Sequence, residues 1–222
     1  MEYLVTMTTH VPQGTAEDTV TDVRAREAEH SRELAVQGHL LRLWRPPLQP
    51  GEWRTLGLFA ADDPARLEDV LASMPLRVWR TDSVTPLAPH PNDPGPGNDP
   101  GPGLAPRSAP DTGPGQQGQE FLVTFTITVP DGVPAAAIAD RKAREARRAR
   151  ELAQQRHILR VWSLPDGRTL GLYRAPDAAG LEAIVASLPL IDWMTVETVP
   201  LTPHPNDPAR ASTEDNAGRQ SG

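Results

Sequence analysis

The chain contains one pattern of about 90 residues twice, and this internal repeat constrains its fold more than any other feature. Residues 2–94 align with residues 120–208 with one four-residue gap, and about half of the aligned positions are identical. HLLRLWR at 39–45 returns as HILRVWS at 157–163, and PLAPHPNDP returns as PLTPHPNDP. Shared composition does not produce such similarity. The chain is therefore predicted to hold two small domains of one fold.

A Pro- and Gly-rich segment separates the repeats. The chain has 25 prolines and 17 glycines, unevenly spread, and this segment is rich in both and has almost no apolar residues to bury. As a flexible coil its ends would lie about 28 Å apart, enough for two small domains to pack side by side. We predict a first domain at 1–94, a linker at 95–119, a second domain at 120–208 and a disordered tail at 209–222.

The hydrophobic periods change in a regular order within each repeat. In the first repeat, alternation at 3–11 predicts a strand, and 16–37 is a long helix-forming stretch that Gly38 can end. Two short alternating segments follow, then a helix opened by Asp63–Pro64 and a strand at 79–87. This is the βαββαβ order of a ferredoxin-like α+β domain. Because its helices cover one sheet face only, we expect the tandem domains to pack sheet to sheet as a pseudo-dimeric α/β barrel.

Composition excludes several classes of protein. There is no cysteine, so disulfides, thiolate metal sites and cysteine nucleophiles are ruled out. No apolar run is long enough to span a membrane, and the first strand begins at Tyr3, which predicts a cytoplasmic protein without a signal peptide. The net charge of −7 argues against nucleic-acid binding. The basic run at 141–150 is interpreted as a solvated helix face, with nucleic-acid contact as the alternative.

Two glutamates occupy unusual positions on the long helices. Glu27 and Glu145 each lie in heptad register with apolar residues on the stripe that should face the sheet. Arg24 and Lys142 stand three residues earlier, close enough to pair with the carboxylates. A carboxylate tuned by burial and a nearby cation suits proton abstraction beside a carbonyl. A structural ion pair is the alternative.

Histidines occupy equivalent places in the two repeats. His39 and His157 follow the long helices, where they can act as proton donors or interact with the helix ends. His90 and His204 follow the last strands without a second histidine at ligand spacing, so no metal site is expected.

The strand after each long helix supplies candidate substrate-binding residues. Arg42 and Arg160 alternate with apolar neighbours and should project from the face opposite Leu41 and Leu43, where arginine could clamp a substrate carboxylate. Tryptophans that share this parity could wall an apolar cavity or fill the core; they are Trp44 and Trp162.

The ordered motifs resemble one known family. Each repeat has a strand ending in VP, a long helix carrying (R/K)AxE, a (L/V)W strand, SxPL after the second helix and a terminal PLxxHP. This order resembles the muconolactone Δ-isomerase family across both repeats. The resemblance implies ferredoxin-like domains that pair through their sheets, no cofactor, and a proton shift within a furanone lactone bearing an acetate arm. In that family muconolactone becomes the 3-oxoadipate enol-lactone.

The resemblance also implies roles for particular residues. Glu27 and Glu145 match the family's helix glutamate, and Arg24 and Lys142 match its basic partner. Arg45 matches an arginine that follows the strand tryptophan.

The chain departs from the family pattern at several of these places. The second repeat has Ser163 where the first has Arg45, and Arg42 and Arg160 stand where the family carries a histidine. The hairpins also lack the family's tyrosine-containing segment, so a relined pocket is expected.

Three functions follow from these observations. The first is a cofactor-free isomerase acting on a lactone or carboxylate, as the fused pair alone or as a ring of such pairs. The second is a cyclase or isomerase for a bulkier secondary metabolite, and the third is a non-catalytic scaffold. A cavity containing Glu27 or Glu145 would favour the first two, and exposed glutamates beside a filled core the third.

Overall fold

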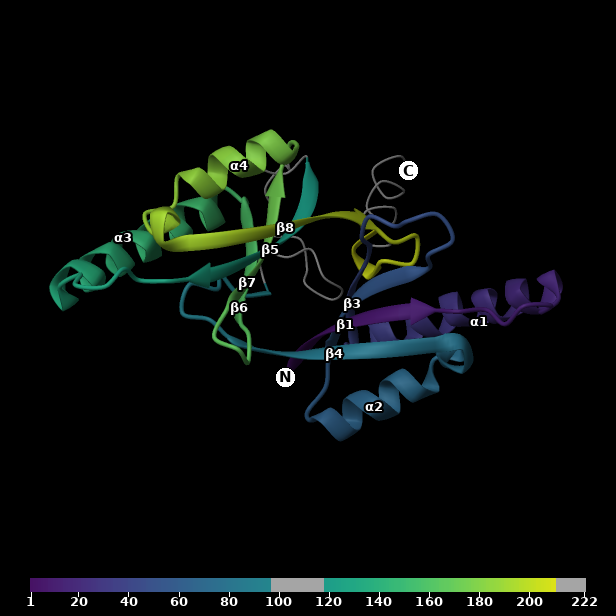
Figure 1. Ribbon diagram of the computed structural model, residues 1–222. Coiled ribbons are helices and arrows are strands. Elements are labelled where there is room, and N and C mark those ends of the chain that lie inside the picture. The colour runs from purple at the N-terminus through teal and green to yellow at the C-terminus, as the bar shows by residue number, and fades with distance from the viewer. Residues whose placement is uncertain (97–117, 211–222) are drawn as a thin grey trace, which may run out of the picture. The chain divides into compact units, whose positions relative to one another are not determined.

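The computed structural model describes residues 1–96 and 118–210, and both repeats have the predicted βαββαβ order (Figure 1). The elements of the first repeat are β1 (Glu2–Thr9), α1 (Glu17–Val36), β2 (Leu40–Arg45), β3 (Arg54–Ala60), α2 (Pro64–Ser73), the 3₁₀ helix η1 (Pro75–Trp79) and β4 (Arg80–Pro89). Those of the second are β5 (Gln119–Ile127), α3 (Ala135–Gln154), β6 (Ile158–Ser163), β7 (Thr169–Ala175), α4 (Ala178–Ala186), the 3₁₀ helix η3 (Ile191–Trp193) and β8 (Met194–Pro203).

Each repeat forms an antiparallel sheet with its two helices on one face. The strand order is β4-β1-β3-β2 in the first repeat and β8-β5-β7-β6 in the second. In the first repeat Val5 and Phe59 of the sheet pack with Leu34 of α1 and Leu71 of α2 in one buried cluster. The second repeat has an equivalent cluster between its sheet, α3 and α4. An apolar face on each helix therefore positions the polar side chains beside it.

The described residues divide into two compact units that differ from the repeats at one place. Unit 1 contains residues 1–87 and 202–210, and unit 2 contains residues 88–96 and 118–201. The end of each last strand therefore belongs to the unit built on the other repeat. There it extends the sheet by short antiparallel pairings, which are Thr202 with Arg45, Pro203 with Trp44, Ala88 with Ser163 and Pro89 with Trp162.

The two long helices end in the same backbone geometry with different residues. α1 ends as predicted: Gly38 has φ +76°, and the next amide, of His39, donates to Leu34 O at 2.9 Å. In the second repeat Arg156 takes this place with φ +61°, and the His157 amide donates to the equivalent carbonyl oxygen at 2.8 Å. Because a left-handed backbone favours glycine, the second repeat keeps this turn at an energetic cost.

A register shift in β2 corrects the predicted alternation of that strand. The pairing with β3 slips between Leu40 and Arg42, so Leu40 rather than Leu41 joins Leu43 in the helix-facing core. Arg42 and Trp44 share the opposite face, with the guanidinium 4.7 Å from the ring centroid. The bulge thus sets which side chains can face the helices.

Some predictions lie outside the described residues. The linker and the tail fall mainly on residues 97–117 and 211–222, which the structure does not describe. The face-to-face packing of the two sheets stays a prediction. None of the helices in the described part of the chain is both long enough and apolar enough to cross a bilayer.

Candidate active site

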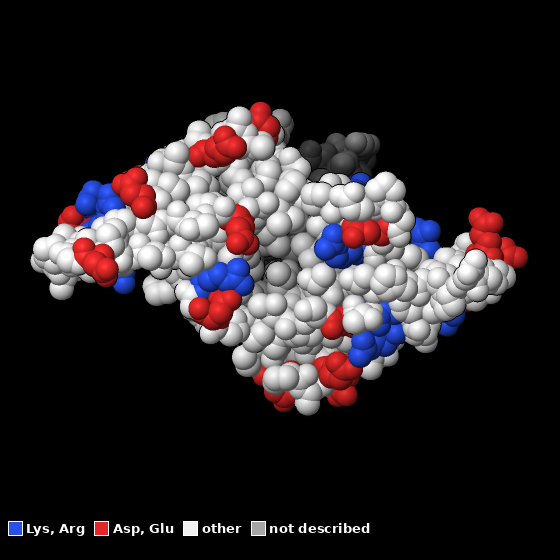
Figure 2. All heavy atoms as spheres, in the orientation of Figure 1, with Lys and Arg blue, Asp and Glu red and all other residues white. Residues whose placement is uncertain are grey.

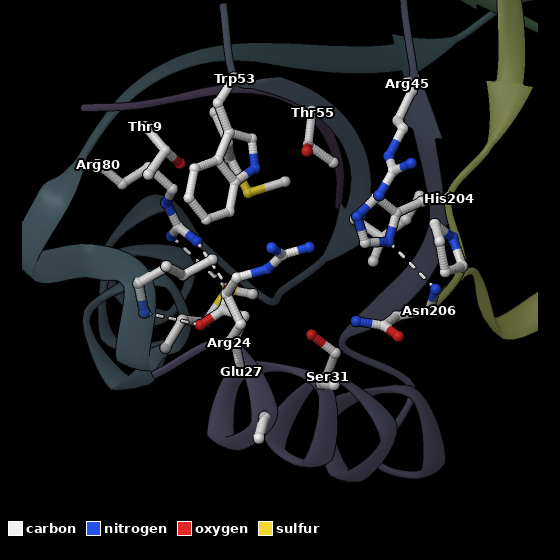
Figure 3. Close-up of a pocket in the computed structure, with 17 residues that line it drawn as sticks. Thr9, Arg24, Glu27, Ser31, Arg45, Trp53, Thr55, Arg80, His204 and Asn206 are labelled. Atoms are coloured by element: carbon white, nitrogen blue, oxygen red, sulfur yellow. Dashed lines mark hydrogen bonds and ion pairs between the residues drawn. The ribbon is translucent and has the colours of Figure 1, made fainter. Parts of the chain in front are cut away.

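A cavity of about 270 Å³ opens in unit 1 between α1, the sheet and residues 204–206; it is called cavity 1 below. Figure 3 shows Arg24, Glu27 and Ser31 rising from α1 into this space. The remaining labelled side chains surround them and come from the strands, the β2–β3 connection and the segment after β8; they are Thr9, Arg45, Trp53, Thr55, Arg80, His204 and Asn206.

Glu27 is the acid of cavity 1, and it is only 7% exposed. Its Oε2 accepts from the Leu76 amide at 2.8 Å, and its Oε1 accepts from Arg80 Nη1 at 3.2 Å. Burial raises the pKa of Glu27 above its ordinary value, against the opposing effects of the Leu76 amide and the Arg80 charge. Glu27 is therefore a fixed carboxylate that takes up a proton more readily than an exposed glutamate.

Arg80 forms the ion pair with Glu27 that was predicted for Arg24. Its Nε and Nη2 donate to Asp82 at 2.7 and 3.1 Å, and Nη2 also donates to Leu71 O at 3.3 Å. Arg24 instead lies over the Trp53 ring, 5.4 Å from its centroid. The expected Arg24–Glu27 pair is thus corrected: the countercharge comes from the start of β4, and Arg24 remains available to the cavity.

Two further cations face the cavity from exposed positions. Neither Arg24 nor Arg45 forms an ion pair with a carboxylate in residues 1–96 and 118–210, and Figure 3 shows both pointing toward the cavity. The charge of Arg80 is balanced by its pairs with Glu27 and Asp82. The excess of positive charge in this space therefore comes from Arg24 and Arg45. Such a site favours an anionic ligand.

His204 adds a neutral polar group that the sequence did not single out as a site residue. Its Nδ1 accepts from the Asn206 amide at 3.1 Å, so the neutral ring carries its proton on Nε2. Burial, with smaller contributions from the charges of Arg45 and Arg24, lowers the pKa of His204 to about 4. At neutral pH the ring is an uncharged hydrogen-bond donor.

Arg42 and Arg160 do not serve as the predicted substrate clamps. Arg42 is 2% exposed, and its Nη2 lies 3.1 Å from Asp207 Oδ2. Asp207 also accepts from the Leu43 amide at 3.0 Å. In unit 2, Arg160 forms the equivalent pair with Asp93 at 3.2 Å. Both arginines therefore hold the end segments that carry His204 and His90, and their carboxylate partners belong to the protein.

The other predicted site residues also have structural surroundings. Trp44 and Trp162 are buried at 1% and 2% exposure and line neither glutamate cavity. His39 Nδ1 lies 3.0 Å from Ala60 O, and His157 Nδ1 lies 3.0 Å from Arg174 O. The histidines tie the helix ends to β3 and β7 and line neither cavity, so their proposed catalytic role is corrected.

Unit 2 has an equivalent but larger cavity of about 480 Å³, called cavity 2 below. Glu145 lines it at 8% exposure and accepts from the Leu190 amide at 3.0 Å, as Glu27 does from Leu76. Burial raises the pKa of Glu145, again against the effect of that amide. Lys142 is exposed and lines cavity 2, but it forms no ion pair with Glu145 in residues 118–210, so this predicted pair is also corrected. The end segment with His90 lines the same cavity. Most of the remaining lining is apolar.

The basic run on α3 is organised by local ion pairs. Arg144 pairs with Asp140 and Arg148 with Glu151 along the helix, at 3.0 Å each. On the face drawn in Figure 2, basic side chains lie beside acidic ones. These features fit a solvated helix face. Within the described residues, no group of three or more His, Asp or Glu is arranged to hold a metal ion.

Comparison with known proteins supports a family assignment. A family model described as Muconolactone delta-isomerase matches residues 1–93 and again 119–207. Muconolactone Delta-isomerase 1 of Acinetobacter lwoffii is 28% identical over 92 residues, covering 41% of this chain and 93% of the relative. The enzyme of Cupriavidus pinatubonensis is 30% identical over 92 residues, covering 41% and 97%. A heme-binding protein of Thermus thermophilus is similar in structure, with TM-score 0.53, 13% identity and 95% coverage of both chains. That last similarity shows the fold alone.

Proposed function

The chain belongs to the muconolactone Δ-isomerase family, and from this premise we propose that it is an isomerase that shifts a proton within an enolisable lactone. Cavity 1 is the proposed active site, and Glu27 is its general acid and base. The observation that carries the proposal is the buried Glu27 carboxylate, held by Leu76 and Arg80 on the wall of a cationic cavity.

The position of Glu27 suits proton transfer in both directions. A base works best when its pKa approaches the operating pH, and burial raises the pKa of this carboxyl group in that direction. The two hydrogen bonds that Glu27 accepts fix its orientation without consuming all of its lone pairs. One carboxylate can therefore remove a proton at one carbon and return it at another.

The proposed reaction needs no net oxidation. Glu27 takes a proton from a carbon whose acidity comes from conjugation with the lactone carbonyl, and the electron pair moves through the conjugated system to the carbonyl oxygen. The same carboxyl group then protonates another carbon of that system, so a double bond changes position. The positive charge of cavity 1 stabilises the enolate formed between the two steps.

Arg24 and Arg45 suit an acidic arm on the substrate. Both are exposed cations on the cavity wall without a carboxylate partner among the described residues. Arginine binds a carboxylate through paired, charge-assisted hydrogen bonds. A lactone bearing a short carboxylate arm, as in muconolactone, would place its anion on these arginines while Glu27 reaches its ring.

The alternative of a non-catalytic scaffold is less well supported. It predicts exposed glutamates beside a filled core, whereas Glu27 and Glu145 are buried and each lines a cavity.

Proton NMR of muconolactone in deuterated water tests the proposal. Wild-type protein should form the enol-lactone and incorporate deuterium, and a Glu27→Gln, Glu145→Gln double variant should do neither. Glu29→Gln changes an exposed glutamate on the same helix and should retain wild-type turnover. If muconolactone is unchanged by wild-type protein, the substrate is wrong; turnover by the double variant would instead exclude the glutamates as acid and base.

A further inference from the structure

The two cavities are lined by equivalent positions of the repeats but differ in chemistry. We propose that cavity 2 is a second ligand site, which takes an uncharged, mainly hydrocarbon molecule bearing one hydroxyl group. This goes beyond the proposed isomerase, because it assigns a different class of ligand to the other unit. Charge, wall composition and one donor–acceptor pair support it.

The two cavities differ in the charged residues that line them. Met194 occupies the position of Arg80, so the cation that pairs with Glu27 has no equivalent beside Glu145. Trp53 also lacks a counterpart, because the hairpin of the second repeat is four residues shorter. The ionisable side chains of cavity 2 are one lysine, one glutamate, one tyrosine and one histidine, His90, whose pKa is lowered by burial. The lysine and glutamate charges balance, so nothing favours an anion.

The walls of cavity 2 are also less polar than those of cavity 1. Thr9 and Ser31 of cavity 1 correspond to Ile127 and Ala149 of cavity 2. Two hydroxyl groups are thereby replaced by hydrocarbon, and Met194 stands where the first repeat has Arg80. Cavity 2 is also larger, at about 480 Å³ against about 270 Å³. An apolar cavity of this size gains binding free energy from ligand surface removed from water.

A donor and an acceptor remain inside this apolar space. Tyr173 replaces Phe59 of the first repeat, lies 4% exposed on the cavity wall, and its hydroxyl bonds to none of the residues that the structure describes. Burial and then the charge of Glu145 raise the pKa of Tyr173 well above its ordinary value, so the phenol stays protonated near that carboxylate. A ligand hydroxyl can donate to Glu145 and accept from Tyr173. Such a ligand would give the Tyr173 hydroxyl a partner and would add a second hydrogen bond to the one that Glu145 accepts from Leu190.

The first experiment compares 2-naphthol with 2-naphthoate, which share one ring system but carry a hydroxyl or a carboxylate. Calorimetric titration of the full chain should show 2-naphthol binding in cavity 2. Ala146→Phe narrows cavity 2, and Ala28→Phe makes the same change in cavity 1. Ala146→Phe should abolish 2-naphthol binding, and Ala28→Phe should leave it intact. Absent binding, or equal loss in both variants, would overturn the proposal.

Two further variants test the chemistry without blocking the cavity. Tyr173→Phe restores the residue of the first repeat and should weaken 2-naphthol binding about five- to tenfold, the effect of one buried hydrogen bond. Met194→Arg gives Glu145 the counterpart of Arg80, adds one positive charge to cavity 2 and should shift preference toward 2-naphthoate. Unchanged affinity in the first variant, or unchanged preference in the second, would contradict the assigned ligand class. Binding is measured without turnover, so failure of the isomerase proposal leaves this test intact.

Discussion

Cavity 1 surrounds its glutamate with arginine, whereas cavity 2 surrounds the equivalent glutamate mainly with alanine, isoleucine, leucine and methionine. The features common to both are a buried acid held by a backbone amide, and an end segment held by an arginine–aspartate pair. These shared features build and position the sites. The features that differ set the charge and size of each cavity, so the residues that build the sites are not the residues that distinguish them.

The largest difference between the cavities should appear in catalysis. Glu27→Gln should lower turnover of a lactone with a carboxylate arm by about 10²- to 10⁴-fold, because it removes the acid and base. Glu145→Gln should leave turnover within about twofold of wild type, since the cationic cavity is in unit 1. Rates of enol-lactone formation measure both. Equal losses would show that both cavities process this substrate.

The arginine–aspartate pairs should differ in their contributions to stability. Asp207→Ala removes a carboxylate that is 0% exposed from Arg42, and loss of a buried partner destabilises a protein by about 3–5 kcal/mol. Asp93→Ala should cost less, because the Asp93 side chain is 15% exposed and better solvated. Urea unfolding of the two variants measures the difference. The reverse order would show that exposure does not govern these pairs.

A smaller effect is expected at the position where an arginine in one repeat corresponds to a serine in the other. Arg45→Ser should raise KM for an acidic lactone about tenfold with kcat nearly unchanged, because one charge-assisted contact to the substrate is lost. Ser163→Arg should leave the same kinetics unaltered, and steady-state assays distinguish the two. A fall in kcat alone would place Arg45 in proton transfer rather than in binding.

The end-segment histidines should make folding stability depend on pH. Burial lowers the pKa of His204 to about 4, so the unfolded chain takes up this proton at higher pH than the folded chain does. Stability is therefore lost as pH falls from about 6.5 toward 4, by about 1 kcal/mol after allowance for solvent screening. His204→Gln should remove this loss, and His90→Gln should remove a smaller one. Urea unfolding at several pH values measures both; an unchanged pH dependence in His204→Gln would contradict the assignment.

The smallest predicted effect concerns the turns after α1 and α3. Arg156→Gly places in the second repeat the residue that the first uses at this left-handed position, and should stabilise it by about 1 kcal/mol. Gly38→Arg should destabilise the first repeat by a similar amount. Thermal unfolding of the pair provides the measurement. A loss of stability in Arg156→Gly would show that Arg156 makes contacts worth more than its backbone strain.

Features set by local sequence were predicted correctly. Alternating and helical periods gave the βαββαβ order, and Asp63 caps α2 by accepting from the Arg66 amide at 2.8 Å. The heptad register of Glu27 and Glu145 placed both glutamates on the buried side of their helices. Each of these features depends on residues within a few turns of one another.

Features that depend on distant pairing were not predictable in the same way. In the sequence, Arg42 has the pattern of a substrate clamp. In the structure, its guanidinium pairs with Asp207, which lies 165 positions away. Arg80 meets Glu27 across 53 positions, so the nearer Arg24 was the expected partner. One signal was present: HPNDP recurs unchanged after both last strands while many neighbouring residues differ. Its histidine, asparagine and aspartate all prove to have roles in or beside the cavities.

The exchange of end segments has an evolutionary consequence. Cavity 1 contains Glu27 from the first repeat and His204 from the second, while cavity 2 combines Glu145 with His90. In a symmetric homodimer of single repeats, every mutation would alter both sites at once. Here both repeats lie in one chain, so a mutation in one repeat leaves the equivalent position of the other repeat unchanged. One site can thus keep its chemistry while substitutions alter the other.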